Sequence, residues 1–253
     1  MPTVTFADVV HQSISFSRTQ PAEALALELI DNPWVQRLRD ISQTANTRLV
    51  YMFSEHSRFG HSVGVAYLAN LLMDKLSHYD SGVNEYREAV SAAALLHDIG
   101  HLAPGSHTAY KTWYPDKPDA HEAVAGRIIA EDAGLQAIFG RRSPQLAETV
   151  AKILDEDDSL PPWTWEIISG GGWNVDRGNW CIVDSILAGV SYGTYNIPAL
   201  TESIVISQNG HLVLKENRLD SMMHFAVSRH AMYRQVYQHR VLLAADTINS
   251  ALV

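Results

Sequence analysis

Histidine and aspartate side chains that could bind a metal are concentrated in one part of this 253-residue chain. Seven of the 12 histidines fall between His56 and His121. His97 and Asp98 end an apolar run, AVSAAALLHD, where an ionisable pair is costly to bury unless each group has a partner. A divalent metal would be a partner for both. The spacing leaves its other ligands open among His61, His107, His121, Asp176 and Asp184, and a hydrogen-bonded core residue is the competing interpretation of each histidine.

The elements that must position these side chains are predicted to be helices. Pro21 at a first helical position and the apolar spacing after it predict helices along most of the chain. The Asn209-Gly210 pair, between two β-rich runs, is typical of a hairpin turn. We therefore expect one all-α domain over residues 1–253, with one small β-hairpin near residues 203–216. The helices are expected at 21–30, 34–43, 61–76, 84–98, 121–133, 144–154, 176–190 and 217–250.

Composition excludes several classes of protein. The net charge of −9 makes a general electrostatic grip on nucleic acid unfavourable, because such binding depends on an excess of Lys and Arg. The single cysteine, Cys181, excludes an intramolecular disulfide and a multi-cysteine metal site, and it fits a reducing, cytoplasmic location. No apolar run approaches the roughly 20 residues of a membrane span, and the N-terminus lacks a signal-peptide pattern.

Five stretches, in chain order, resemble the HD-domain metal-dependent phosphohydrolases, and specifically their deoxynucleoside triphosphate triphosphohydrolase branch. They are QRLRDISQ at 36–43, SRFGHSVGVAYLA at 57–69, LLHDIGH at 95–101, NVDRGNWCIVD at 174–184 and SRHAMYRQVYQH at 228–239. The HD dipeptide is a weak signal by itself, whereas the ordered set is specific and spans nearly the whole chain. The resemblance implies an HD-domain helical bundle.

The resemblance also implies a metal site of two imidazoles and two carboxylates, formed by His61, His97, Asp98 and Asp176. Asp176 is preferred to Asp184 because a V-D pair followed eight residues later by a second aspartate matches the family's segment. One divalent ion per chain is expected. These ligands suit Mn²⁺, Fe²⁺ or Mg²⁺, with Zn²⁺ or Ni²⁺ also possible.

Further histidines resemble the residues that contact phosphates or act as the general acid in this family. They are His101, His107 and His121, and Glu122 is placed to orient its neighbour His121. The run between His101 and His107 is one residue longer than in the family, and an aspartate expected soon after is replaced near Tyr110. This departure favours His121 over His107 as the acid.

The predicted substrate contacts follow from the same resemblance. Arginine forks suit phosphate oxygens, although a surface ion pair is the competing interpretation of each arginine. A tyrosine is expected to exclude a ribose 2′-hydroxyl, and two polar residues to bind the deoxyribose 3′-hydroxyl. The phosphate contacts are Arg58, Arg177 (a lysine in the family) and Arg229; the sugar contacts are Gln43, Asp184, Tyr237 and Trp180, the last at a position where relatives often have tyrosine.

The implied activity is hydrolysis of deoxynucleoside triphosphates to deoxynucleoside and tripolyphosphate. A nucleoside monophosphatase or another phosphodiesterase on the same fold stays open, as does a non-catalytic nucleotide-binding module. His101 in place of a lysine, and Ile99-Gly100 in place of an acidic pair, disfavour the cyclic-dinucleotide and alarmone branches. The chain lacks the C-terminal lobe of nucleotide-regulated members, which predicts a catalytic core or a truncated chain. Tryptophans outside the motifs, and the oligomers of the family, predict a homo-oligomer.

Overall fold

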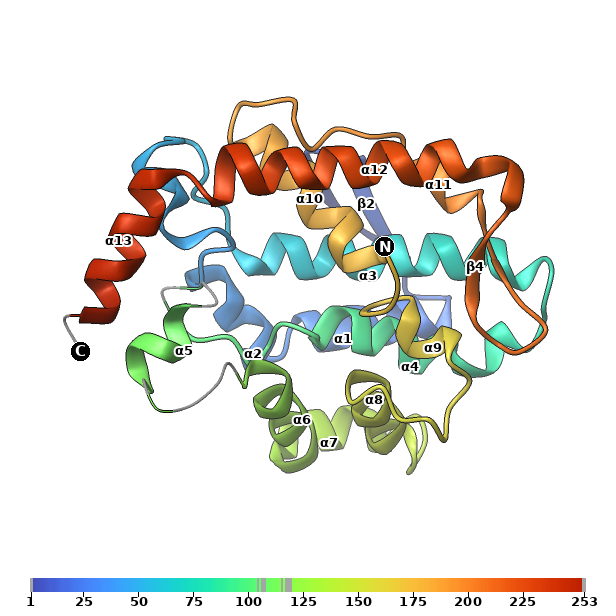
Figure 1. The fold of residues 1–253 in the computed structure, drawn as a ribbon. Coiled ribbons are helices and arrows are strands. Elements are labelled where there is room, and N and C mark those ends of the chain that lie inside the picture. The colour runs from blue at the N-terminus through green and yellow to red at the C-terminus, as the bar shows by residue number, and fades with distance from the viewer. Residues whose placement is uncertain (1, 104, 106–107, 115, 117–119, 252–253) are drawn as a thin grey trace.

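Two long helices form the centre of the computed structural model, which describes residues 2–103, 105, 108–114, 116 and 120–251. Helix α3 (Arg58–Ser77) packs along α4 (Val83–Leu96). Helices α10 and α12 lie on one side of this pair, and α6, α7 and α8 lie on the other (Figure 1). The remaining bounds are α1 Pro21–Ile30, α2 Pro33–Gln36, α5 Thr108–Trp113, α6 His121–Glu131, α7 Ala133–Gly140, α8 Leu146–Leu154, α9 Trp163–Glu166, α10 Val175–Leu187, α11 Ile197–Thr201, α12 Leu219–Met232 and α13 Arg240–Ala251.

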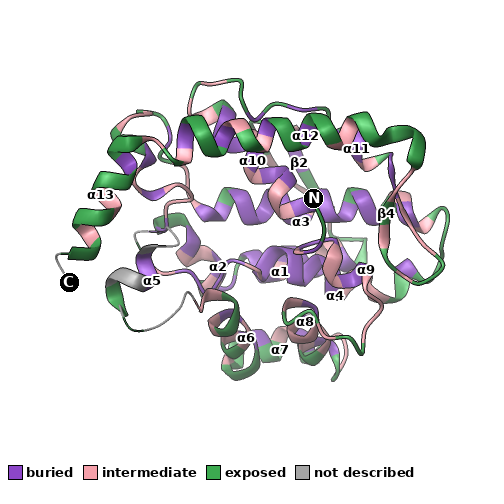
Figure 2. Cartoon of the chain, in the orientation of Figure 1, coloured by how far each residue is buried: buried purple, intermediate pink, exposed green. Residues whose placement is uncertain are grey.

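Helix α3 is buried on most of its surface, which is why its sequence shows no strong polar face. Figure 2 draws α3 and α1 mostly in the colour of buried residues, whereas α12 and α13 are largely exposed. Gly64 lets α10 approach closely, since a Cβ there would lie 2.5 Å from the side chain of Asn179. The close approach of these two helices brings the start of α10 to the start of α3.

The expected all-α fold is confirmed, but the prediction of a single hairpin is incomplete. The predicted hairpin is present as β3 (Ile204–Ile206) and β4 (Leu212–Leu214), with Gly210 at φ 78° in its turn. A second antiparallel pair joins β1 (Thr3–Asp8) to β2 (Gln12–Ser17). Its turn has no Asn-Gly pair; instead, Asp8 Oδ1 accepts hydrogen bonds from the two backbone N–H groups of residues 10 and 11.

Two predicted helices differ from the observed chain. Residues 34–43 form only the short α2 and a 3₁₀ turn, Arg37–Asp40, before the chain becomes extended and Ser42 pairs with Ser57. The predicted helix 217–250 is divided into α12, a π-helical turn (Tyr233–Tyr237) and α13. Both interruptions occur where the chain borders the candidate site, so local helix propensity is overridden by tertiary contacts.

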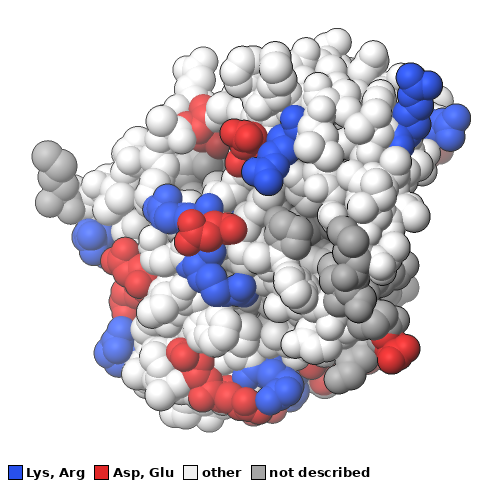
Figure 3. Space-filling model, turned by 90° about the vertical axis from the view of Figure 1, so that its left-hand side faces the viewer, with Lys and Arg blue, Asp and Glu red and all other residues white. Residues whose placement is uncertain are grey.

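One continuous cluster of buried apolar side chains extends from Ile14 to Val236. Within the described ranges, no helix is both long enough and apolar enough to cross a bilayer. Lys and Arg are interspersed with Asp and Glu on the face drawn in Figure 3, so its described residues form no continuous basic field.

Candidate metal centre and its pocket

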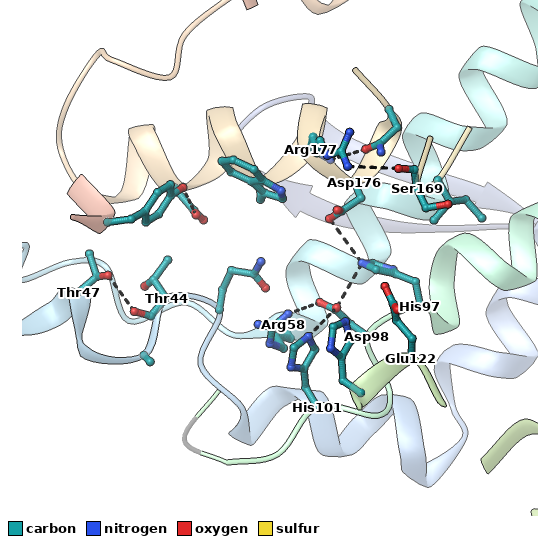
Figure 4. A pocket seen from close by; sticks show the side chains of 18 of the residues that line it. Thr44, Thr47, Arg58, His97, Asp98, His101, Glu122, Ser169, Asp176 and Arg177 are labelled. Carbon is teal, nitrogen blue, oxygen red and sulfur yellow. Dashed lines mark hydrogen bonds and ion pairs between the residues drawn. The ribbon is translucent and has the colours of Figure 1, made fainter. Parts of the chain in front are cut away.

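The four predicted metal ligands meet at the ends of three helices. His61 lies in the first turn of α3, His97 and Asp98 directly follow α4, and Asp176 lies in the first turn of α10. His61 Nε2 lies 3.0 Å from Asp176 Oδ1 and 3.8 Å from Asp98 Oδ2. His97 Nε2 lies 3.5 Å from Asp98 Oδ1 and 3.6 Å from Asp176 Oδ1 (Figure 4). These distances bring four side chains from three segments together. The ligand atoms of His61, His97 and Asp176 lie within 4.8 Å of one another, and Asp98 forms a second such group with His101 and His121.

The chemistry of this cluster fits a cation. His97 Nδ1 donates a hydrogen bond to the Ala94 carbonyl at 2.8 Å, and His61 Nδ1 donates one to Asn179 Oδ1 at 2.9 Å. Each ring therefore directs its Nε2 toward the carboxylates, and the buried Nε2 of His97 has no hydrogen-bond partner among the described residues. Two imidazole and two carboxylate acceptors that face one another need a proton or a metal ion between them.

The pKa values of these groups reflect the same arrangement. Burial lowers the pKa of His97, but the Asp98 and Asp176 carboxylates outweigh burial and raise it to about 9. Burial would raise the pKa of Asp98, yet Arg58 and the nearby histidines hold it well below its usual range. The hydrogen bond with His61 and the nearby ring of His97 likewise lower the pKa of Asp176 against the effect of burial. Both carboxylates are therefore ionised at neutral pH, as metal ligands must be.

Arg58 is the buried counter-charge of this cluster. Its Nη1 donates to Asp98 Oδ2 at 2.5 Å, and both side chains are almost inaccessible to solvent. The pair is held where backbone bonds join residues 41–43 to residues 56–58: Arg58 N donates to the Ile41 carbonyl and Gln43 N to the His56 carbonyl. The predicted phosphate contact at Arg58 thus lies beside the predicted metal ligands.

Replacing Arg58 by methionine is expected to lower the free energy of unfolding of the metal-free protein by about 3–5 kcal/mol, because Asp98 would keep a buried charge without its partner. Urea denaturation in EDTA measures this loss. Arg87→Met is the control, since the Arg87–Asp74 pair is partly exposed and contributes about 0–1 kcal/mol. A loss for Arg58→Met no larger than that of the control would contradict the prediction.

Two further histidines stack beside Asp98. His101 Nε2 donates to Asp98 Oδ1 at 3.2 Å, and the rings of His101 and His121 are stacked with centroids 4.0 Å apart. Burial lowers the pKa of His101 to about 4 in spite of the raising effect of Asp98, so this ring is neutral at pH 7. Glu122, next to His121 on α6, also lines the pocket. His107, the other predicted acid, lies outside the described residues.

Because Gly100 has no side chain, helix α6 can pack closely against residues 97–101. A Cβ at this position would lie 1.9 Å from the His121 carbonyl oxygen and 2.8 Å from the Ala125 nitrogen. Those atoms belong to the backbone, so a larger residue would displace the helix. Arg37 supports the same turn from the other side, because its Nη2 donates to the carbonyls of Ile99 and His101.

Gly100→Ala is therefore expected to reduce turnover by at least about tenfold, as misplacing a reacting group by about 1 Å costs up to 100-fold. Metal content should stay near one ion per chain, because His121 is not among the four predicted ligands. Gly140→Ala is the matched control, since a Cβ there meets nothing within 4 Å. Unchanged turnover in Gly100→Ala would show that the position of His121 does not matter.

The predicted sugar contacts surround Asp184. Tyr237 Oη donates to Asp184 Oδ2 at 2.6 Å, and His56 Nε2 lies 2.7 Å from Asp184 Oδ1. Burial and this carboxylate raise the pKa of Tyr237 well above its usual value, so the phenol keeps its proton. The rings of Trp180 and Tyr237 pack in a T-shaped arrangement, with centroids 5.7 Å apart. Gln43 lines the same pocket, and its buried Oε1 has no partner among the described residues.

Two of the predicted phosphate contacts are placed differently from Arg58. Arg177 lines the pocket, but its guanidinium donates to the carbonyls of Ser169 and Gly171. Arg229 is absent from the described pocket lining, and its guanidinium lies over the ring of Tyr233 at 5.0 Å. Both roles remain predictions that would need these side chains to reorient.

Three positioning residues were missed by sequence reasoning. Asn179 orients His61, His56 holds Asp184, and Arg37 holds the turn after α4. Asn179 could have been found, because it lies three residues after Asp176 and thus on the same face of a helix. His56 and Arg37 act across long stretches of chain and have no comparable local signal.

The pocket beside the candidate metal centre is an open cavity of about 470 Å³. Protein cavities that bind small molecules typically have a volume of about 300–1,000 Å³. Three of the four candidate metal ligands line it, namely His97, Asp98 and Asp176. Asp184, Trp180 and Tyr237 belong to the same lining. The cavity therefore brings a candidate metal centre and a polar-aromatic pocket together.

Known proteins are similar to this chain in sequence and in fold. Residues 58–168 match the family described as the HD domain. The uncharacterized protein YwfO of Bacillus subtilis is 31% identical over 251 residues, which cover 96% of this chain and 53% of YwfO. The deoxynucleoside triphosphate triphosphohydrolase SAMHD1 of Danio rerio is 26% identical over 273 residues, covering 95% of this chain and 43% of that protein.

A solved phosphohydrolase from Bacteroides thetaiotaomicron has the same fold, with a TM-score of 0.79 and 26% identity over 96% of this chain and 56% of that one. This chain spans about half the length of the curated relatives that it matches. The resemblance drawn from the five sequence stretches is thereby confirmed. The chain carries an HD domain and is a relative of the HD-domain phosphohydrolases.

Proposed function

We propose that this chain is a divalent-metal-dependent hydrolase that converts deoxynucleoside triphosphates to deoxynucleoside and tripolyphosphate. The observation that carries the proposal is the convergence of His61, His97, Asp98 and Asp176, as mutually facing acceptors, beside a cavity that also contains Arg58 and His121. The substrate class is supported by the name of the Danio rerio relative and by the motifs shared with that branch.

A divalent cation in this cluster would polarise the α-phosphate and lower the pKa of the attacking water. The chain's own residues would do the rest. Arg58 would bind a phosphate oxygen beside Asp98. His121 would give a proton to the 5′ oxygen as its bond to the α-phosphorus breaks, while the oxygen of the water forms the new bond to that phosphorus. The proton that the water loses would pass to solvent, and solvent would return a proton to His121. The two products are a neutral deoxynucleoside and a tripolyphosphate anion.

The sugar would lie against the Asp184 pocket. Gln43 and Asp184 would bind the 3′-hydroxyl, and the ring of Tyr237 would occupy the space that a 2′-hydroxyl needs. Because the Tyr237 hydroxyl is bonded to Asp184, the ring cannot swing away without losing that hydrogen bond. The arrangement supports selection of deoxyribonucleotides over ribonucleotides.

A substrate with fewer phosphates is the second candidate, and the charge of the cavity favours it. Among the described lining residues, Arg58 and Arg177 are the basic side chains besides histidine, and Arg177 is bonded to backbone carbonyls. The lining carboxylates are Asp98, Glu122, Glu156, Asp176, Asp184 and Asp246. A nucleoside monophosphate carries less negative charge into this surrounding than a triphosphate does.

Product analysis distinguishes the two candidates. Purified protein loaded with Mn²⁺ or Fe²⁺ would be incubated with matched deoxynucleoside mono- and triphosphates, and ion chromatography would separate orthophosphate, pyrophosphate and tripolyphosphate. Tripolyphosphate in a 1:1 ratio with deoxynucleoside supports the first candidate. Orthophosphate alone, with faster turnover of monophosphates, supports the second. His97→Ala protein is the control for contaminating phosphatases.

A further inference from the structure

His56 contacts two of the residues that line the sugar end of the cavity. Its ring Nε2 donates to Asp184 Oδ1 at 2.7 Å, and its backbone carbonyl accepts a hydrogen bond from Gln43 N at 2.9 Å. Gln43 and Asp184 belong to the described lining of the cavity, whereas His56 does not. His56 therefore acts on the cavity through these two neighbours.

The ring of His56 makes no second hydrogen bond or ion pair within the described ranges. Its Nδ1 is buried and has no partner there. The side chains of His56 and Asp184 are 13% and 5% exposed, so their contact is shielded from water. A hydrogen bond to a carboxylate is stronger in such surroundings than in solvent. The polar contact of this ring is thus directed at Asp184.

Asp184 is held by two donors from different parts of the chain. His56 donates to its Oδ1, and the hydroxyl of Tyr237 donates to its Oδ2 at 2.6 Å. The carboxylate cannot rotate without losing both hydrogen bonds, and its remaining lone pairs keep a fixed direction. A polar group that is fixed in advance binds a ligand hydroxyl with a smaller loss of entropy.

The backbone around His56 connects the sugar end of the cavity to the candidate metal centre. Ser57 is extended, with φ −95° and ψ 159°, and it forms a β-bridge with Ser42. Residues on either side of an extended residue point to the same side of the chain. Accordingly, His56 bonds to Asp184, and Arg58 bonds to Asp98 beside the metal ligands. One short segment thereby fixes the separation of the two ends of the site.

We propose that His56 is the positioning residue that makes the site selective for a 3′-hydroxyl, because it holds Asp184 by its side chain and Gln43 by its backbone. The buried Oε1 of Gln43 has no partner in the part of the chain that the structure describes, so the site has an unfilled acceptor. A nucleotide without a 3′-hydroxyl leaves these polar groups unpaired, which is costly. The inference rests on the proposed function, since it takes the sugar to lie against Asp184.

The test compares dATP with 2′,3′-dideoxyadenosine triphosphate, which differs from it only in lacking the 3′-hydroxyl. The kcat/KM of Mn²⁺-loaded wild type is expected to favour dATP by at least about 30-fold. In His56→Asn, the amide nitrogen takes the place of Nδ1 and does not reach Asp184. This variant should lower kcat/KM for dATP by about fivefold to tenfold, mainly by raising KM, and that for the dideoxy compound by at most about twofold.

His56→Gln is the matched variant, because its amide nitrogen lies as many bonds from Cα as the Nε2 of histidine and can donate to Asp184. Its preference for dATP should stay within about threefold of wild type. His211→Ala is the remote control: His211 Nδ1 lies 2.7 Å from Glu166 Oε1, outside the described lining of the cavity. The preference of this control should change by at most about twofold. Far-UV circular dichroism verifies that every variant is folded.

Binding of nucleosides separates this inference from the proposed reaction. Deoxyadenosine and 2′,3′-dideoxyadenosine have no phosphate to lose, so their Kd values from isothermal titration calorimetry do not depend on turnover. Wild type is expected to bind deoxyadenosine at least about tenfold more tightly, and His56→Asn should narrow this difference to about twofold.

Two results would overturn the proposal: a wild type that does not distinguish the deoxy from the dideoxy ligands, or a His56→Asn protein in which kcat/KM falls equally with both triphosphates. A loss that is common to both triphosphates is what a merely structural role of His56 predicts. If neither triphosphate is turned over but nucleoside binding responds to His56→Asn as expected, the proposed reaction is overturned and this inference is supported.

Discussion

His97→Ala protein is expected to lose its bound divalent ion, and its turnover is expected to fall by more than about 100-fold. Substituting a residue that only supports a metal ligand typically lowers metal affinity or activity by about 10-fold to 100-fold. His97 supplies a buried Nε2 that faces two carboxylates and has no hydrogen-bond partner in the part of the chain that the structure describes. Removing the ring leaves three ligands around the cation and opens space for water. Metal content by inductively coupled plasma mass spectrometry, together with turnover, measures the result.

His78→Ala is the matched control. His78 is an exposed histidine at the end of the same helix that carries His61, and it is bonded to the backbone carbonyl of Asp74. Its loss should leave metal content and turnover unchanged. If His97→Ala kept a full equivalent of metal, or if both variants lost it equally, the assignment of the metal centre would be wrong. Circular dichroism should show the same helix content in all three proteins.

Tyr237→Ala is expected to narrow the preference for deoxyribonucleotides over ribonucleotides by about 10-fold to 100-fold. A buried ribose 2′-hydroxyl without a hydrogen-bond partner costs about 1–3 kcal/mol before any steric effect. Without the ring of Tyr237, the 2′-hydroxyl would have space and could form a hydrogen bond with water. The measurement is the ratio of kcat/KM for each deoxyribonucleotide to that for its ribonucleotide counterpart.

Tyr237→Phe separates the ring from its hydroxyl. Phenylalanine keeps the steric bulk and the contact with Trp180 but loses the hydrogen bond to Asp184. The Tyr237→Phe protein should retain most of the preference for deoxyribonucleotides over ribonucleotides. Its KM should rise, because of the two side chains Tyr237 and His56 only His56 would still hydrogen-bond to Asp184. Discrimination that falls equally in both variants, or in neither, would contradict a steric role for the ring.

The helical fold could be predicted because its signal is local. Four helices, α1, α3, α4 and α10, could be predicted from the spacing of their apolar residues and from the residues at their ends. Both signals are visible in a short window of sequence. The first hairpin was missed because its turn is formed by the Asp8 side chain rather than by an Asn-Gly pair. The interruptions at Arg37–Asp40 and Tyr233–Tyr237 were missed because their cause lies in distant contacts.

The sequence by itself determined the residue types of the centre and the family to which they point. Histidines and aspartates in an ordered set of motifs indicate an HD-type metal site, and that inference needs no coordinates. The spacing of His61, His97 and Asp176 in the chain contains no information about their separation in space. Gly64 and Gly100, which permit the close helix contacts, act only once the helices are packed.

Only the tertiary structure decided the direction in which each charged side chain points. Arg58 lies three residues before a predicted ligand and Arg177 directly follows one, yet Arg58 pairs with buried Asp98 while Arg177 donates to backbone carbonyls. Buried charges and buried polar groups must each find a partner, and the nearest partner in space is often far away along the chain. That requirement, rather than sequence proximity, determines which arginine pairs with a buried carboxylate and which acceptors face one another in the candidate metal centre.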